Sequence, residues 1–138
     1  MSTSSRPPSG PRGLIGAAAE DAAAAYLEGI GWAILARNIR LGADEIDIVA
    51  RDEDEPPTLV VVEVRSRSVE GFGSALESMG GGKVVRLYRA AMALRRAGHP
   101  EVPWRDLSLA DWRVDLLTMR RRGRAWAVEA HLRALAPP

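Results

Sequence analysis

Cysteine is absent from the 138-residue sequence, and only two histidines are present, His99 and His131. The absence of cysteine excludes a disulfide framework and any Cys-ligated zinc, haem or iron–sulfur site. Two widely separated histidines are too few for a histidine-based metal site. No uninterrupted apolar run approaches the roughly 18 residues of a transmembrane helix, so we expect no membrane partner.

Lysine is almost absent as well, because Lys83 is the only lysine among 19 basic residues. A compositional preference for arginine explains most of this bias without any function. The formal net charge is +1, but residues 44–55 hold seven acidic residues and one arginine, so this segment carries −6 and the rest of the chain +7. An acidic segment in a basic chain suits a metal-dependent enzyme acting on a polyanion. An acidic loop on an arginine-rich protein has the same pattern.

The length fits one domain with a single hydrophobic core. Residues 1–12 are rich in serine and proline and predict a disordered tail, which leaves residues 13–138 as the domain. The apolar run after Arg12 stops at Glu20 and Asp21, which is too short for a typical signal peptide. We therefore expect a cytoplasmic protein.

Apolar periodicity and turn residues predict two long helices and five strands. The helices are expected at 14–28 and 83–97, with a short helical turn at 75–79 broken by three glycines. The strands are expected at 32–40, 45–51, 58–65, 111–119 and 124–129, and a basic turn at 120–123 joins the last two. This order, α-β-β-β-α-β-β, predicts an α/β fold with a mixed sheet.

The second predicted strand carries acidic residues within an apolar pattern. Because side chains alternate along a strand, Glu45, Asp47 and Val49 should share one face, while Ile46 and Ile48 share the other. If this strand pairs with the next, Asp47 comes close to an acidic residue there.

That residue is Glu63, which lies inside an otherwise apolar strand, where an uncompensated carboxylate costs several kcal/mol. Two carboxylates on adjacent strands are a usual way to hold Mg²⁺, which would activate water and stabilise a phosphodiester transition state. Alternatively, Asp47 and Glu63 pair with arginines at the sheet edge. Glu20, on the small-residue stripe of the first helix, either reaches the same site or faces solvent at the helix border.

Several short motifs follow one another from about Gly13 to His131. They are Ala19-Glu20-Asp21, Gly31-Trp32, Glu45-Ile46-Asp47-Ile48-Val49, Val62-Glu63-Val64-Arg65, Phe72-Gly73, Lys83-Val84-Val85-Arg86 and Trp112-Arg113-Val114-Asp115. The ordered set resembles the YraN-type family of small bacterial proteins, which is assigned to the restriction-endonuclease-like fold of the PD-(D/E)xK nucleases. The resemblance implies a mixed sheet flanked by two long helices.

Nucleases of that fold carry a Glu on the first helix, an Asp on one strand and Glu-x-Lys on the next. By position, the resemblance implies Glu20, Asp47 and Glu63 as catalytic and metal-binding residues for Mg²⁺ or Mn²⁺, with Arg65 in the place of the lysine. Arginine stays charged and does not exchange a proton with water, although it can clamp a phosphate. The chain is therefore expected to be a metal-dependent endonuclease or, alternatively, a non-catalytic nucleic-acid-binding module that retains the fold.

Basic residues suited to a nucleic-acid backbone occur in two groups. Lys83, Arg86, Arg89 and Arg96 are spaced to form a stripe on the second long helix, and Arg120, Arg121 and Arg122 form the basic turn. We expect these residues to contact DNA, branched or single-stranded, without reading its sequence. Both groups are also what a solvated surface of an arginine-rich chain contains.

Overall fold

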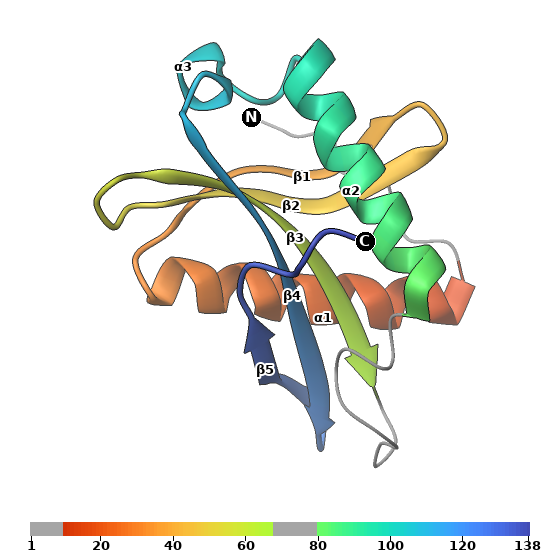
Figure 1. The fold of residues 1–138 in the computed structure, drawn as a ribbon. Helices are drawn as coiled ribbons and strands as arrows, with labels where there is room; N and C mark the ends of the chain where they lie inside the picture. The colour runs from red at the N-terminus through yellow and green to blue at the C-terminus, as the bar shows by residue number, and fades with distance from the viewer. Residues whose placement is uncertain (1–9, 68–79) are drawn as a thin grey trace.

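The computed structural model describes residues 10–67 and 80–138 (Figure 1). Its elements are α1 (Gly10–Gly29), β1 (Ala33–Leu41), β2 (Asp44–Asp52), β3 (Thr58–Arg67), α2 (Gly80–Ala97), α3 (Trp104–Leu107), β4 (Asp111–Arg122) and β5 (Ala125–Leu132). The predicted helical turn at 75–79 lies outside the described residues. The two long helices and the five predicted strands are present in the predicted order.

Both long helices begin earlier than predicted. Helix α1 starts at Gly10, so residues 10–12, which we assigned to the tail, belong to the helix. Helix α2 starts at Gly80, so the three glycines form its first turn instead of breaking the chain. Glycine is tolerated there because the first amides of a helix have no partner within the helix in any case. The short helix α3 lies between α2 and β4, in a segment where no helix or strand was predicted.

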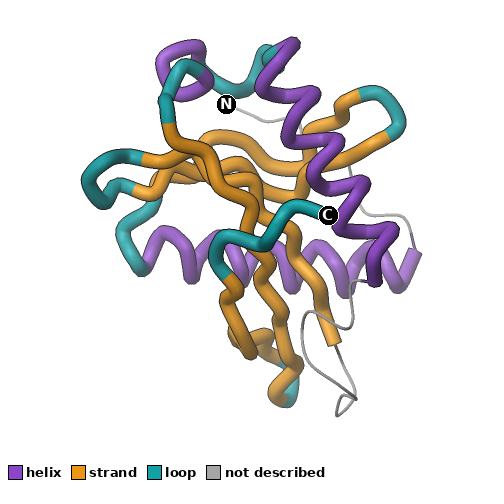
Figure 2. The backbone as a smooth tube through the Cα atoms, viewed as in Figure 1, coloured by secondary structure: helices purple, strands orange, loops and turns teal. Residues whose placement is uncertain are grey.

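The strands of the described residues form one sheet in the order β1-β2-β3-β4-β5 (Figure 2). Strands β3 and β4 are parallel, whereas the other neighbours are antiparallel. A parallel pair needs a crossover connection, and the chain between β3 and β4 contains α2. The predicted mixed sheet is therefore confirmed.

Two apolar clusters lie on opposite faces of the sheet. Leu87 and Leu94 of α2 belong to one cluster, together with Val61 of β3. Ala23 and Leu27 of α1 belong to the other. The sheet thus lies between the two long helices, as predicted, and α1 and α2 define its two sides (Figure 1).

The alternation predicted for β2 fails at Asp47. Ile46 packs on the α2 side of the sheet, whereas Ile48 packs on the α1 side, so these two residues do not share a face. The cause lies in β1, where Asn38 has a φ of 52° and interrupts the pairing between Arg37↔Ile48 and Ile39↔Ile46. Asp47 therefore sits at a local break in the sheet.

The basic turn also differs from its prediction. Strand β4 continues through Arg120, Arg121 and Arg122, and the chain reverses at Gly123, which has a φ of 62°. The positive φ suits glycine and fixes the turn one residue beyond the arginines. These three arginines consequently lie on a strand and not in a turn.

Candidate active site

The carboxyl groups of Asp47 and Glu63 meet where β2 and β3 separate. The ladder between these strands ends at Ile48↔Val62, so Asp47 and Glu63 are the next residues beyond the last pair. Asp47 Oδ2 accepts a hydrogen bond of 2.8 Å from the backbone N–H of Val64. The two carboxyl groups lie close enough for the charge of Glu63 to act on Asp47, and both line the same cavity. The convergence that alternation predicted for this pair is present.

Both members of this pair hold protons more tightly than exposed carboxyl groups. Burial, followed by the charge of Glu63, raises the pKa of Asp47 well above its usual value. Burial also raises the pKa of Glu63, against the opposing charges of Arg65 and Lys83. One proton shared between two close carboxylates relieves their repulsion. A divalent cation would relieve the same repulsion more completely.

Glu20 approaches the pair from α1. Burial and the charge of Asp47 raise the pKa of Glu20 to about 7, although a hydrogen bond with Asn38 opposes this shift. Asn38 is a site residue that sequence reasoning missed. Its signal was an asparagine within a strand, since asparagine tolerates the left-handed backbone better than most residues.

A cavity of about 440 Å³ opens over these carboxyl groups. The described residues that line it are Glu20, Ala43, Asp44, Glu45, Asp47, Glu63, Val64, Arg65, Ser66, Lys83, Arg86 and Leu87. Helix α1 and strand β2 supply acidic groups, whereas α2 supplies Lys83 and Arg86. The structure thus brings six of the predicted site residues to one cavity, and it adds Glu45, whose charge raises the pKa of both Glu20 and Asp47.

Arg89 has a different environment. Its guanidinium group makes two hydrogen bonds to Asp44, with Nε–Oδ2 at 2.7 Å and a second nitrogen to Oδ1 at 2.8 Å. These bonds, together with the charge of Arg86, lower the pKa of Asp44. Arg89 therefore joins α2 to the start of β2, and it is not among the described residues that line the cavity.

The arginines of β4 also lie outside the described lining of the cavity. Arg120 approaches Glu129 at 3.9 Å, and the guanidinium carbon of Arg121 lies 5.9 Å from the centre of the Trp126 ring. Arg122 is exposed. A nucleic-acid contact by this group stays a prediction.

The donor set fits a cation held by two carboxylates. Within residues 10–67 and 80–138, no group of three or more His, Asp or Glu side chains is arranged to hold a metal ion. Mg²⁺, however, is commonly bound through one or two carboxylates and completes its shell with water and phosphate oxygens. Asp47 and Glu63 meet that requirement, with Glu20 as a neighbouring acid.

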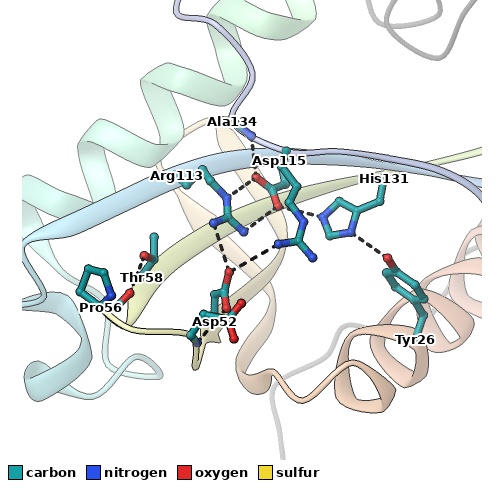
Figure 3. Close-up of polar contacts among 10 residues, drawn as sticks. Tyr26, Asp52, Pro56, Thr58, Arg113, Asp115, His131 and Ala134 are labelled. Atoms are coloured by element: carbon teal, nitrogen blue, oxygen red, sulfur yellow. Dashed lines mark hydrogen bonds and ion pairs between the residues drawn. The ribbon is translucent and has the colours of Figure 1, made fainter.

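A second polar cluster joins β4 and β5 to α1 (Figure 3). His131 lies between Asp115, at 2.8 Å from Nε2, and the hydroxyl of Tyr26, at 2.9 Å from Nδ1. Arg113 makes two hydrogen bonds to Asp115 and a third to Asp52. Because Asp115 is completely buried, this cluster is a structural connection.

The sheet and the cavity define a mixed α/β protein in which a pair of carboxyl groups shares a cavity with Lys83 and Arg86 of α2. The sequence model of the family described as "Uncharacterised protein family UPF0102" matches residues 19–119, and the chain belongs to this family. This confirms the YraN-type resemblance.

Relatives from several bacteria match over most of the chain. A UPF0102 protein of Deinococcus radiodurans is 44% identical over 102 residues, which cover 72% of this chain and 81% of the relative. Another, from Pseudarthrobacter chlorophenolicus, is 36% identical over 123 residues, covering 89% and 86%. Among solved structures, SfsA of Pyrococcus furiosus in complex with Ca²⁺ matches with a TM-score of 0.40 and 16% identity, covering 86% of this chain and 63% of that one. This last likeness is too distant to support an argument.

None of the helices in the described part of the chain is long and apolar enough to cross a membrane.

Proposed function

We propose that this protein is a divalent-metal-dependent endonuclease of the restriction-endonuclease-like fold, acting on the phosphodiester backbone of DNA. The observation that carries the proposal is the pair of acidic side chains, Asp47 and Glu63, which line one cavity where the pairing of β2 with β3 ends. Mg²⁺ or Mn²⁺ bound to these carboxylates would supply an activated water and stabilise charge on the reacting phosphate. Glu20 is the third acidic residue of the site.

The opposite wall of the cavity supplies what a polyanionic substrate requires. Lys83 and Arg86 lie on the same side of α2, three residues apart, and both line the cavity. They would hold the DNA backbone, and Arg65 would contact phosphate beside Glu63. Contacts of this kind bind without reading bases, so we expect little sequence preference on branched or single-stranded DNA.

The proposal is tested by incubating the purified protein with branched and single-stranded DNA in Mn²⁺, Mg²⁺ or EDTA. We expect cleavage that requires the metal and falls by about 100-fold or more in Asp47→Asn, because this change removes a charged ligand while keeping its shape. Asp54→Asn, an exposed acid in the turn after β2, is the matched control and should cleave normally. Equal cleavage by wild type and Asp47→Asn would overturn the site assignment.

Calorimetry separates metal binding from chemistry. Mg²⁺ should bind the wild type and Asp54→Asn, and binding should be lost in Asp47→Asn and in Glu63→Gln. Heat of binding that is unchanged in both site variants would contradict the proposed cation site.

A second candidate function is a nucleic-acid-binding module without catalysis. The observation that favours it is that Arg65 lines the cavity at the position where the nuclease motif has a lysine. It predicts salt-sensitive DNA binding that does not depend on metal and is unchanged in Arg65→Lys. If cleavage instead appears or increases in Arg65→Lys, the result would support the nuclease and contradict the non-catalytic module.

A further inference from the structure

The three cations of the cavity differ in the partners they already have. Arg65 follows Glu63 by two residues on the same strand and takes part in further interactions. Arg86 acts on Asp44, next to the turn between β1 and β2, where its charge helps to lower the pKa of this carboxyl group. One of its guanidinium nitrogens is 3.6 Å from where a Cβ on Gly82 would lie, so the side chain folds back along α2. Arg65 therefore already has partners, and Arg86 acts on Asp44, whereas the cationic influences given for Glu63 are Arg65 and Lys83.

Lys83 differs from both arginines in its surroundings. It is exposed, lines the cavity, and makes no hydrogen bond or ion pair with any described residue. Its charge nevertheless acts on Glu63, where it and Arg65 are the two strongest cationic influences. A charge close enough to act on Glu63 but not paired with it is available to a second anion at the same place.

From this arrangement we infer that Lys83 is a catalytic residue, which donates a hydrogen bond to a non-bridging oxygen of the phosphodiester that reacts at Asp47 and Glu63. The inference rests on the proposed function. A compact ammonium group with three rotatable donors can reach a phosphate oxygen beside a carboxylate pair without the planar geometry that a guanidinium group requires.

The hydrolysis that Lys83 would assist balances without any proton leaving the lysine. A bond forms between the water oxygen and phosphorus while the bond from phosphorus to the leaving sugar oxygen breaks. The attacking water loses one proton to solvent, and the leaving oxygen takes one from solvent. Lys83 would donate a hydrogen bond and stabilise negative charge on the non-bridging oxygen, which is electrostatic stabilisation by a placed donor.

The uniqueness of Lys83 supplies a direct probe. Reductive methylation with ¹³C-formaldehyde places a dimethylammonium label on the sole lysine and on the chain's amino terminus, and it preserves the charge. A Lys83→Arg sample assigns the lysine signal by its absence. We expect this signal to shift when single-stranded DNA is added in Ca²⁺, and also when inorganic phosphate is added with Mg²⁺. Arg105→Ala, an exposed arginine in α3 that does not line the cavity, should leave the response unchanged.

Kinetics on the unlabelled protein distinguish a catalytic contact from a binding contact. Lys83→Ala should lower kcat by about 100-fold and weaken DNA binding by a much smaller factor, in line with the loss of one transition-state donor. Arg86→Ala should weaken DNA binding with little effect on kcat, and Arg105→Ala should change neither. Lys83→Arg should recover part of kcat.

The outcomes separate this inference from the proposed function. Metal-dependent cleavage that is lost in Asp47→Asn but kept in Lys83→Ala would uphold the nuclease and overturn the role of Lys83. A lysine signal that responds to neither DNA nor phosphate also overturns it, whatever the cleavage assay gives. A signal that responds to both probes, in a protein that cleaves nothing, would keep the phosphate contact and refute the nuclease.

Discussion

Glu20 keeps its proton up to a pH of about 7 because its side chain is partly buried and lies beside Asp47. An unfolded chain would release that proton near the ordinary value of 4.5. A raised pKa in the folded state means that folding favours the protonated form, so this contribution to stability is complete below pH 4.5. It is lost as the pH rises through 7. Above that pH the ionised Glu20 side chain destabilises the folded state unless a cation is bound beside it.

We therefore predict that Glu20→Gln flattens the pH dependence of the free energy of unfolding between pH 4.5 and 7.5. The amide mimics the protonated acid and does not ionise. The slope that the variant loses is at most about 1.4 kcal/mol per pH unit, and solvent screening at this partly exposed site makes it smaller. Urea unfolding at several pH values measures it, with Glu28→Gln at the exposed end of α1 as control. An identical slope in wild type and Glu20→Gln would refute the prediction.

Divalent cations should act in the opposite direction to rising pH. Mg²⁺ binds ionised carboxylates and competes with protons, so the stabilisation by Mg²⁺ should grow between pH 5 and 8. We expect Mg²⁺ to raise the Tm of the wild type at pH 8 and to have little effect on Asp47→Asn. A shift in Tm that is equal in both proteins would place the ion elsewhere.

At the scale of elements, the cavity has two walls that different parts of the chain supply. One wall begins at the turn between β1 and β2, and the other is the first half of α2. The two bonds between Arg89 and Asp44 connect them. We therefore predict that Arg89 acts as a positioning residue between the acidic strand and α2, in place of the DNA contact expected from the sequence.

Exchanging the two charges tests that explanation. Arg89→Asp and Asp44→Arg should each lower cleavage several-fold by placing like charges together, and the double variant should recover to within about twofold of wild type. If Arg89 instead contacts DNA, the double variant keeps an acid at position 89 and should bind DNA as weakly as the single variant. Cleavage rates and DNA affinity for the four proteins decide between the two roles.

At the scale of the whole molecule, the local pattern predicted the elements but not their connections. Glycine stops and apolar periodicity indicated both long helices, and β-branched runs indicated the central strands. The alternation of side chains correctly predicted that Asp47 and Glu63 lie close together, because this closeness depends only on the pairing of two neighbouring strands. It failed for Ile46 and Ile48 because one asparagine in the paired strand took a left-handed conformation.

Contacts between distant residues left no local signal. Tyr26 and His131 are 105 residues apart in the chain, yet they are hydrogen-bonded. Asp115 looked like one acid in a strand, but it is completely buried and accepts hydrogen bonds from Arg113 and from the backbone of Ala134. Such a cluster becomes visible only when the parallel pairing of β3 with β4 and the return of β5 are known.

The cluster around Asp115 should therefore control the resistance of the whole fold to acid. Burial alone would raise the pKa of Asp115, but hydrogen bonds from His131 and Arg113 hold it below the ordinary value of 3.8. A lowered pKa means that its contribution to stability is present above pH 3.8 and is lost as the pH falls below that value. We expect Asp115→Asn to lose about 3 kcal/mol at neutral pH, because it leaves the half-buried Arg113 with one charged partner fewer. Asp21→Asn, which removes the exposed pair with Arg37, should cost less than about 1 kcal/mol.

Urea unfolding at pH 7 and pH 3 measures the free energy of unfolding of these variants. The difference in this free energy between wild type and Asp115→Asn should be smaller at pH 3. A difference of the same size at the two pH values would mean that packing, and not the charge of Asp115, stabilises this end of the molecule.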